Sequence, residues 1–170
     1  SGLGDAHRGN HDLDQAVVVW TTAVTLYPDN FQILTRLGDA LVKTGNPVKA
    51  RRYYQDALNI NPNDRYALSG LGNLLVRQRE FKQARPLLEQ LVAQQPHSQR
   101  ALGSLANLFR KQNQYEQALQ VFERILDINP FSVHALDGAA DCARGLKIYP
   151  KAINFWKKAI EAGMEPHVAN

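Results

Sequence analysis

The chain repeats itself every 34 residues, and this period constrains its fold more than any other feature of the sequence. No insertion breaks the period. Prolines recur at Pro28, Pro62, Pro96 and Pro130. Alanines recur at Ala16, Ala50, Ala84, Ala118 and Ala152, and large apolar residues at Trp20, Tyr54, Leu88, Phe122 and Trp156. A fixed period of roughly 20–50 residues is typical of architectures that stack one structural unit many times.

Each repeat predicts a pair of helices. In the second repeat, Leu34, Leu37 and Leu41 fall at the spacing of one helical face. Ala50 and Tyr54 belong to a second apolar stripe, and the proline that follows it prevents the helix from continuing. A single helical hairpin cannot bury two such stripes, whereas stacked hairpins can. The sequence therefore predicts an all-α solenoid of antiparallel helix pairs.

The same residues carry a resemblance to a known family. The set Leu37, Gly38, Leu41, Ala50, Tyr54, Ala57 and Pro62 closely resembles the tetratricopeptide repeat family. The resemblance covers nearly the whole chain. The chain departs from the family where leucine replaces the family's tryptophan at the fourth position of a unit, and in the small residues of the fifth unit. The resemblance implies a right-handed superhelix in which the first helices line a concave surface that binds peptide segments of partner proteins.

The period also predicts how the chain is organised. We expect residues 1–170 to form a single repeat array. Its units are residues 1–30 (N-terminally truncated), 31–64, 65–98, 99–132 and 133–166, and residues 167–170 begin a further unit or form a tail. Because an uncapped solenoid exposes apolar faces at its termini, we expect the terminal repeats to associate with other copies of the chain.

Two groups of repeat residues have a predicted packing role. We expect the periodic aromatics to lie in the core, namely Trp20, Tyr54, Phe122 and Trp156. Glycines inside the first helices have two interpretations, because each costs about 1 kcal/mol relative to alanine. Gly70, Gly103 and Gly138 either let adjacent helices approach or leave room for a ligand.

The sequence contains no motif that points to catalysis. It has neither a glycine-rich phosphate loop nor the H-E-x-x-H or C-x-x-C pattern. Its histidines lie in different repeats, except for His7 and His11, which are interpreted as a solvated pair. Its one cysteine, Cys142, is interpreted as a buried structural thiol. We therefore expect no enzyme activity, no cofactor and no metal.

Charge and hydropathy argue against two classes of partner. The chain has 20 Lys and Arg residues against 16 Asp and Glu, and this mild excess does not predict a nucleic-acid-binding face. The longest uncharged stretch, residues 15–28, is shorter than the ~20 residues that cross a bilayer. We expect neither nucleic acid nor membrane as a partner.

The polar face of the first helices supplies the candidate peptide-binding groove. The candidates are Arg36, Lys43, Tyr66, Asn73, Arg77, Arg100, Asn107, Arg110, Lys111 and Arg144. The basic residues near helix ends have two interpretations: they stabilise the helix C-terminus by ~0.3–1 kcal/mol, or they form a basic rail that attracts an acidic peptide or a terminal carboxylate. The asparagine amides could bind an extended peptide backbone. Asp39, Asp137 and Asp141 on the same face argue against a uniformly anionic ligand.

These observations predict a non-catalytic protein–protein interaction scaffold that binds a peptide segment of a partner protein in the concave groove. Two alternatives stay open. The chain could be a structural or oligomerisation module, or it could be the recruiting arm of a larger enzyme whose catalytic domain lies outside this segment. Nucleic-acid binding, which helical repeats can perform, is the weakest alternative because the charge is nearly balanced.

Overall fold

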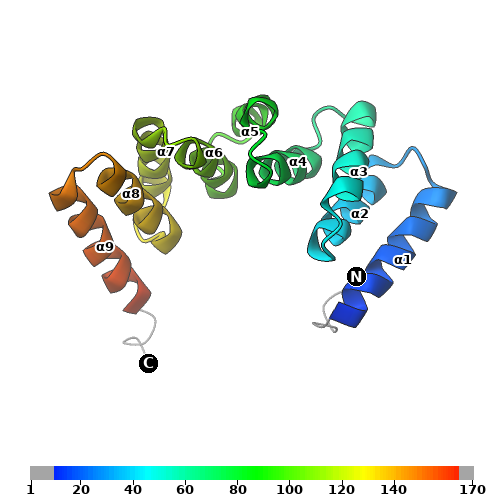
Figure 1. The fold of residues 1–170 in the computed structure, drawn as a ribbon, viewed down its shortest axis with the longest axis horizontal. Helices are drawn as coiled ribbons and strands as arrows, with labels where there is room; N and C mark the ends of the chain where they lie inside the picture. The colour runs from blue at the N-terminus through cyan, green and yellow to red at the C-terminus, as the bar shows by residue number, and fades with distance from the viewer. Residues whose placement is uncertain (1–9, 165–170) are drawn as a thin grey trace. The chain divides into compact units, whose positions relative to one another are not determined.

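The computed structural model describes residues 10–164 of the chain (Figure 1). In that range the chain forms nine α-helices and no strand, which confirms the predicted all-α fold. The helices are α1 (Asn10–Leu26), α2 (Phe31–Lys43), α3 (Pro47–Ile60), α4 (Arg65–Arg77), α5 (Phe81–Gln94), α6 (Gln99–Lys111), α7 (Tyr115–Ile128), α8 (Val133–Gly145) and α9 (Tyr149–Met164). The chain divides into two compact units, Ser1–Leu74 and Leu75–Asn170. The division of the sequence into five repeats stays a prediction.

The first unit is organised around α2, which packs against both α1 and α3. Leu37 of α2 is fully buried. Tyr54 of α3 is also buried, and its ring lies so close to α2 that a Cβ added at Gly38 would be 2.7 Å from the ring atom Cε1. The hydroxyl of Tyr54 donates a hydrogen bond of 2.6 Å to Asp39 Oδ1. Tyr54 is therefore a core residue with its polar tip paired, as predicted.

In the second unit, each helix from α5 to α9 packs against the next one along the chain. Leu102 of α6 and Leu136 of α8 are buried, and so is Phe122 of α7. The ring of Phe122 fills the space that a Cβ on Gly138 would need, and it meets the His134 ring edge-on at 6.0 Å between centroids. The core position predicted for Phe122 is confirmed.

The other two periodic aromatics are not core residues, and their predicted positions are wrong. Trp20 is half-buried, because Arg36 stands where later repeats have a small residue, and its guanidinium lies 5.4 Å from the Trp20 ring centroid. Trp156 is also half-buried, and its Nε1 donates to Asp137 Oδ1 at 3.3 Å. Burial at this repeat position depends on the residue that the neighbouring helix supplies.

The first helix of each repeat begins with a side-chain cap that keeps the 34-residue period. The capping side chains accept hydrogen bonds from backbone N–H groups in the first turn, and they belong to Asn30, Asp64, Ser98 and Ser132. These residue types are the ones preferred at helix N-termini. The caps therefore fix where α2, α4, α6 and α8 start.

The turn within each helix pair has a left-handed residue at one repeat position. The residues and φ angles are Gly45 (78°), Arg79 (61°), Asn113 (59°) and Lys147 (61°). The residue after each donates its backbone N–H to a carbonyl at the end of the preceding helix, as Ile148 does to Ala143 at 2.8 Å. This is the hydrogen bond of a Schellman motif, which ends a helix in a tight turn.

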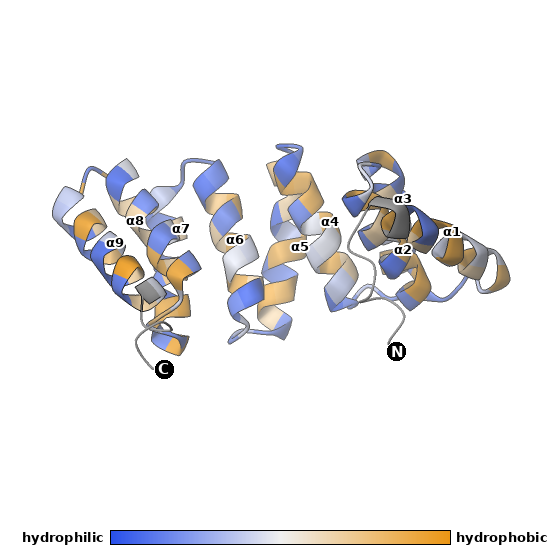
Figure 2. Cartoon of the chain, turned by 90° about the horizontal axis from the view of Figure 1, so that it is seen from below, coloured by the Kyte–Doolittle hydropathy of each residue, from blue (hydrophilic) through white to orange (hydrophobic). Residues whose placement is uncertain are grey.

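The helices mix hydrophobic and hydrophilic residues (Figure 2). Between residues 10 and 164, none of them is both long enough and apolar enough to cross a membrane. Each helix therefore has one face available for packing and another for water or a partner.

Candidate functional site

Three residues of the predicted groove line one pocket in the second unit. Arg110 and Lys111 from the last turn of α6 and Arg144 from the last turn of α8 surround a volume of about 380 Å³. Its other lining residues are Tyr115, Asp141 and Gly145. We call this set the basic pocket. The ends of two successive first helices and the start of α7 position its side chains.

Asp141 holds two of the three cations in place. Its Oδ2 lies 3.1 Å from Arg110 Nη1, and its Oδ1 lies 3.0 Å from Arg144 Nη2. The side chains of Asp141 and Arg110 are each about one-third exposed, whereas Arg144 is 62% exposed. One carboxylate thus orients two guanidiniums from neighbouring first helices, and charge-assisted bonds of this kind are the stronger hydrogen bonds in proteins.

Lys111 adds a positive charge that the pocket does not neutralise. It is exposed and forms no ion pair with any residue that the structure describes. Three cations therefore face the single carboxylate of Asp141, and the basic pocket carries a net charge of +2.

An aromatic ring forms one wall of the basic pocket. Tyr115, the first residue of α7, is half-buried, and its hydroxyl donates to Asn113 Oδ1 at 3.0 Å. A Cβ added at Gly145 would lie 2.7 Å from the Tyr115 ring atom Cδ2. The absence of a side chain at the end of α8 therefore lets the ring lie there, which gives the pocket an apolar side beside its charges.

The two asparagines of the predicted groove differ in their surroundings. Asn73 Nδ2 lies 3.4 Å from Ser69 Oγ and donates to it. Asn107 has its Oδ1 buried with no hydrogen-bond partner among the described residues. Leaving a buried acceptor unpaired costs about 1–3 kcal/mol. A side-chain rotation that turned the Asn107 oxygen outward would let it accept a hydrogen bond from a ligand and remove this cost.

Two groove candidates in the first unit pair with neighbouring side chains. Arg36 packs on Trp20. Tyr66 is 52% exposed, and Arg65 lies over its ring at 4.8 Å while donating from Nη2 to the Tyr66 hydroxyl at 2.9 Å. Tyr66 thus presents an aromatic surface that a cation of the chain already covers.

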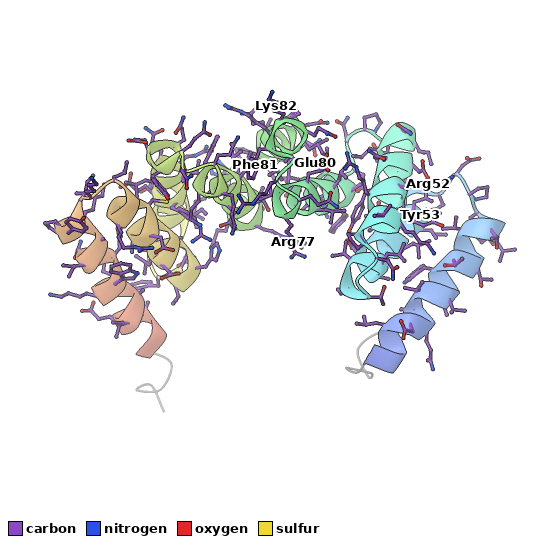
Figure 3. The ribbon with its side chains drawn as sticks, viewed as in Figure 1. Arg52, Tyr53, Arg77, Glu80, Phe81 and Lys82 are labelled. Carbon is purple, nitrogen blue, oxygen red and sulfur yellow. The ribbon has the colours of Figure 1, made fainter. Side chains whose placement is uncertain are left out.

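The remaining candidates are exposed at helix ends and do not join the basic pocket. Lys43 is the last residue of α2, and Arg77 is the last residue of α4 (Figure 3). Arg100 lies in the first turn of α6. For Lys43 and Arg77, the structure supports the simpler interpretation that a cation stabilises the helix C-terminus.

A second pocket, which the sequence reasoning missed, lies in the first unit. Its volume is about 500 Å³, and its lining includes Arg52 and Tyr53 of α3 (Figure 3) with Val24, Pro28 and Ile60. The predicted groove includes residues of the first helices only, whereas this pocket lies against a second helix. The sequence signal for it is the adjacent cationic and aromatic pair of Arg52, which is exposed, and Tyr53, which is partly buried.

The described residues contain no group that suggests catalysis at the basic pocket. No cluster of three or more His, Cys, Asp or Glu side chains that could hold a metal ion occurs within residues 10–164. Cys142, next in sequence to Asp141, is fully buried, and burial raises the pKa of its thiol to about 11. The thiol is therefore protonated near neutral pH, and the net positive charge of the basic pocket suits an anion.

Comparisons with known proteins give a family and several solved structures of the same fold. Sequence profiles of the tetratricopeptide repeat match residues 7–74, 69–133 and 104–165. The crystal structure of MamA shares 20% identity over 98% of this chain and 98% of that chain, with a TM-score of 0.86. A MamA structure from Desulfovibrio magneticus RS-1, spanning its residues 41 to the end, shares 20% identity over 91% and 87%, with a TM-score of 0.85.

A third structure, YrrB, is described as a TPR protein with an unusual peptide-binding site. It shares 20% identity over 89% of this chain and 78% of that chain, with a TM-score of 0.77. No curated protein matches the sequence. At this identity the structural likeness shows the fold alone, an all-α helical repeat solenoid.

Proposed function

This chain belongs to the tetratricopeptide repeat family, and we propose that it is a non-catalytic scaffold that binds an acidic peptide segment of a partner protein. The observation that carries the proposal is the basic pocket, in which Arg110, Lys111 and Arg144 converge. Proteins of this family generally act as interaction scaffolds, and a charged pocket on a first-helix face supplies a place for the partner.

The charge and the preorganisation of the pocket support an anionic ligand. Arginine presents its donors in a planar fork that matches a carboxylate. Arg110 and Arg144 are already held by Asp141, so a ligand would not have to order two flexible side chains. Because the ordering of side chains is one of the main costs of binding, this arrangement favours affinity.

Stabilisation of helix ends does not account for Arg110. If α6 needed a cation at the place of Arg110, the equivalent place in α4 would need one too, yet Val76 stands there and is buried. Arg110 instead reaches Asp141 of the following first helix. Arg110 and Arg144 thus replace the valines that stand at this position in α2 and α4, and both pair with Asp141.

The other groove residues remain proposals. In the second unit, Asn107 lies one turn before Arg110 on α6 and would contact the backbone of the peptide that the pocket anchors. Arg77 and Arg100 would add long-range attraction. In the first unit, the proposed contacts are Arg36, Lys43, Tyr66 and Asn73.

A matched pair of triple variants tests the proposal. Peptides would first be selected from a displayed random library on the full chain, and their affinities measured by fluorescence anisotropy. We expect acidic peptides whose binding weakens by about tenfold or more, or about 1.4 kcal/mol, in the variant R110Q/K111Q/R144Q. The control K82Q/K157Q/K158Q removes the same charge from exposed sites outside the pocket and should leave binding within about twofold.

The same experiment can contradict the proposal. If both triple variants bind the selected peptides equally, the pocket is not the binding site. If no peptide is selected above background, the chain does not bind linear peptides. Circular dichroism of the variants checks that they remain folded.

Self-association is a second candidate function, and the exposed face of α9 favours it. Ile153 and Ile160 are 50% and 63% exposed, although Leu119, the counterpart of Ile153 one repeat earlier in α7, is only 6% exposed. A packing stripe of α9 is thus open to water. The variant I153E/I160E should shift sedimentation at high concentration toward the monomer, and an unchanged profile would count against this role.

A further inference from the structure

We infer that the basic pocket prefers the dianionic phosphate of a phosphorylated side chain on the partner peptide over a carboxylate, an inference that rests on the proposed function. The pocket concerned is that of Arg110, Lys111 and Arg144, with Asp141 between the two arginines.

The charge of the pocket matches a phosphate better than a carboxylate. Its lining carries +2, because Asp141 offsets one of three cations. A carboxylate would leave one positive charge unpaired. A phosphorylated serine or threonine carries about −1.5 to −2 at neutral pH and presents three strong acceptor oxygens. A phosphate monoester would therefore neutralise the pocket almost completely.

The donors that remain free also suit a phosphate. Arg110 uses Nη1 for Asp141, and Arg144 uses Nη2. Each guanidinium has further N–H groups, and Lys111 adds an ammonium that no described residue pairs. Because these donors come from three side chains on two helices, they can reach several oxygens of one phosphoryl group. A planar carboxylate offers only two oxygens for the same donors.

Asp141 gives the pocket a reason to discriminate. Its carboxylate already occupies the place between Arg110 and Arg144 that a ligand carboxylate would otherwise take. A ligand carboxylate would therefore compete with Asp141 for the same donors, and it would bring only one negative charge to the pocket. Asp141 repels a dianion more strongly than it repels a carboxylate, but the three cations also attract the dianion more strongly, so the net charge of the pocket favours it, as phosphate recognition by arginine clusters illustrates.

The shape of the pocket fits a side chain that ends in a phosphate. Its volume of about 380 Å³ is near the lower end of the range for small-ligand pockets. The Tyr115 ring, which fills the space that a side chain at Gly145 would need, gives the methylene stem an apolar wall. A phosphoryl group among the cations and its stem against the ring would use both parts of the pocket.

The test compares three capped amino acids as probes, titrated into the ¹⁵N-labelled full chain and followed by NMR. The probes are N-acetyl-phosphoserine amide, N-acetyl-glutamate amide and N-acetyl-serine amide. At about pH 7.5 we expect phosphoserine to bind about tenfold more tightly than glutamate, and serine not to bind. The shifted resonances should belong to residues of the basic pocket.

Acid should weaken the phosphate complex selectively. The second phosphate pKa is about 6, so lowering the pH from about 7.5 to about 5.5 converts most of the dianion to the monoanion. The groups facing the pocket are Arg110 and Lys111 of α6, Tyr115 of α7, and Asp141 and Arg144 of α8, and no histidine lines it. We expect the phosphoserine affinity to fall severalfold while the glutamate affinity changes little.

Three single variants keep the test interpretable. Lys111→Gln changes an exposed residue without an ion pair in the described chain, so it should remain folded and lose most of the preference for phosphoserine. Asp141→Asn raises the pocket charge to +3 and should strengthen the binding of both anions, that of the dianion more. Lys82→Gln, outside the pocket, should change neither affinity.

Each outcome decides between the claims. Equal binding of phosphoserine and glutamate would overturn the preference and leave the acidic-peptide function intact, because that function is tested separately by peptide selection. Chemical-shift changes confined to residues outside the basic pocket would show that phosphoserine binds elsewhere on the chain. Vesicles of phosphatidylcholine with phosphatidic acid provide a second arm: if they bind the chain through Arg110 and Arg144 more tightly than phosphoserine does, the phosphate belongs to a lipid and the peptide assignment is wrong.

Discussion

The ring of Tyr54 occupies the space that a side chain at Gly70 would need. A Cβ at Gly70 would lie 2.5 Å from Tyr54 Cζ, closer than real side chains approach. In the second unit, Phe122 has the same relationship to Gly138. These two residues occupy the repeat positions of Tyr54 and Gly70. Of the two interpretations of the helix glycines, close packing thus holds for Gly70 and Gly138. The backbone entropy that a helical glycine loses is offset by the burial of a large aromatic ring.

Replacing Gly138 by alanine should therefore destabilise the chain. The added methyl overlaps the Phe122 ring, which is fully buried and cannot move without disturbing its neighbours. Overpacking of this kind costs about 1–3 kcal/mol. Urea unfolding followed by circular dichroism would measure the loss in the free energy of unfolding.

Gly103→Ala is the matched control for this prediction. Gly103 is buried inside α6, but the nearest atom to an added Cβ is His134 Cε1 at 3.7 Å, an ordinary contact. Alanine there should stabilise the chain by up to about 1 kcal/mol through helix propensity. If the two substitutions have the same effect, aromatic packing is not the reason for the glycine at position 138.

A second prediction concerns the left-handed turn residue Lys147. Its φ of 61° is a strained value for a residue with a side chain, whereas Gly45 holds the equivalent turn without that strain. Lys147→Gly should raise the free energy of unfolding by about 1 kcal/mol, the cost of the left-handed conformation. Thermal unfolding would show a higher midpoint. Gly45→Ala should lower it, and a lower midpoint for Lys147→Gly would contradict this account.

The repeat period predicted the helices well because it reports which residues must be buried together. Leu34 and Leu102 occupy equivalent places and are both buried. Trp20 and Trp156 were misplaced because periodicity describes a position, whereas burial also depends on what covers it. At the repeat position of Arg36, later repeats have Gly70 and Gly138, which leave room for a buried aromatic ring. Arg36 itself covers the Trp20 ring only in part.

The basic pocket could be predicted only in part. Helical spacing placed Arg110 and Arg144 on the polar face of the first helices, 34 residues apart, so the sequence predicted that both belong to the groove. Their common partner was not, because Asp141 was interpreted as an argument against an anionic ligand rather than as the residue that orients both cations. Pairing between neighbouring helices depends on side-chain reach, which a one-dimensional pattern does not contain.

A third prediction concerns the thiol of Cys142. Burial raises its pKa from 9.0 to about 11, Arg110 opposes the shift, and Asp141 adds to it. The folded chain should therefore react slowly with a thiol reagent at about pH 8, because the thiolate is the reactive form. Above pH 9 the unfolded chain loses a proton that the folded chain keeps, so this group lowers stability between pH 9 and about 11.

The variant Cys142→Ala isolates that effect from other groups that titrate at alkaline pH. Wild type and variant would be unfolded in urea from about pH 7 to about pH 11, and the difference between their free energies of unfolding compared. We expect the wild type to lose stability relative to the variant above pH 9. A pH-independent difference, or rapid modification of the folded wild type, would show that the thiol is not held in its protonated form.

The last prediction concerns Asp64, which joins two helices of the first unit. Its Oδ2 accepts from Ala67 N at 3.1 Å, capping α4, and from Thr35 Oγ1 of α2 at 2.8 Å. Asn30 caps α2 through the N–H groups of its own helix alone. Loss of a cap costs about 1 kcal/mol. Loss of the buried hydrogen bond from Thr35 adds about 1 kcal/mol, because the hydroxyl then keeps only Phe31 O, at 2.9 Å, as an acceptor. Asp64→Ala should therefore destabilise the chain more than Asn30→Ala.

A double-mutant cycle separates the two roles of Asp64. Thr35→Val removes the hydroxyl, so Asp64→Ala in that background should cost only the cap, close to the cost of Asn30→Ala. The coupling free energy between Thr35 and Asp64 should then be about 1 kcal/mol or more, as expected for buried side chains in contact. Additive effects of the two substitutions would mean that Asp64 acts on α4 alone, and that the hydrogen bond from Thr35 does not help to hold α2 against α4.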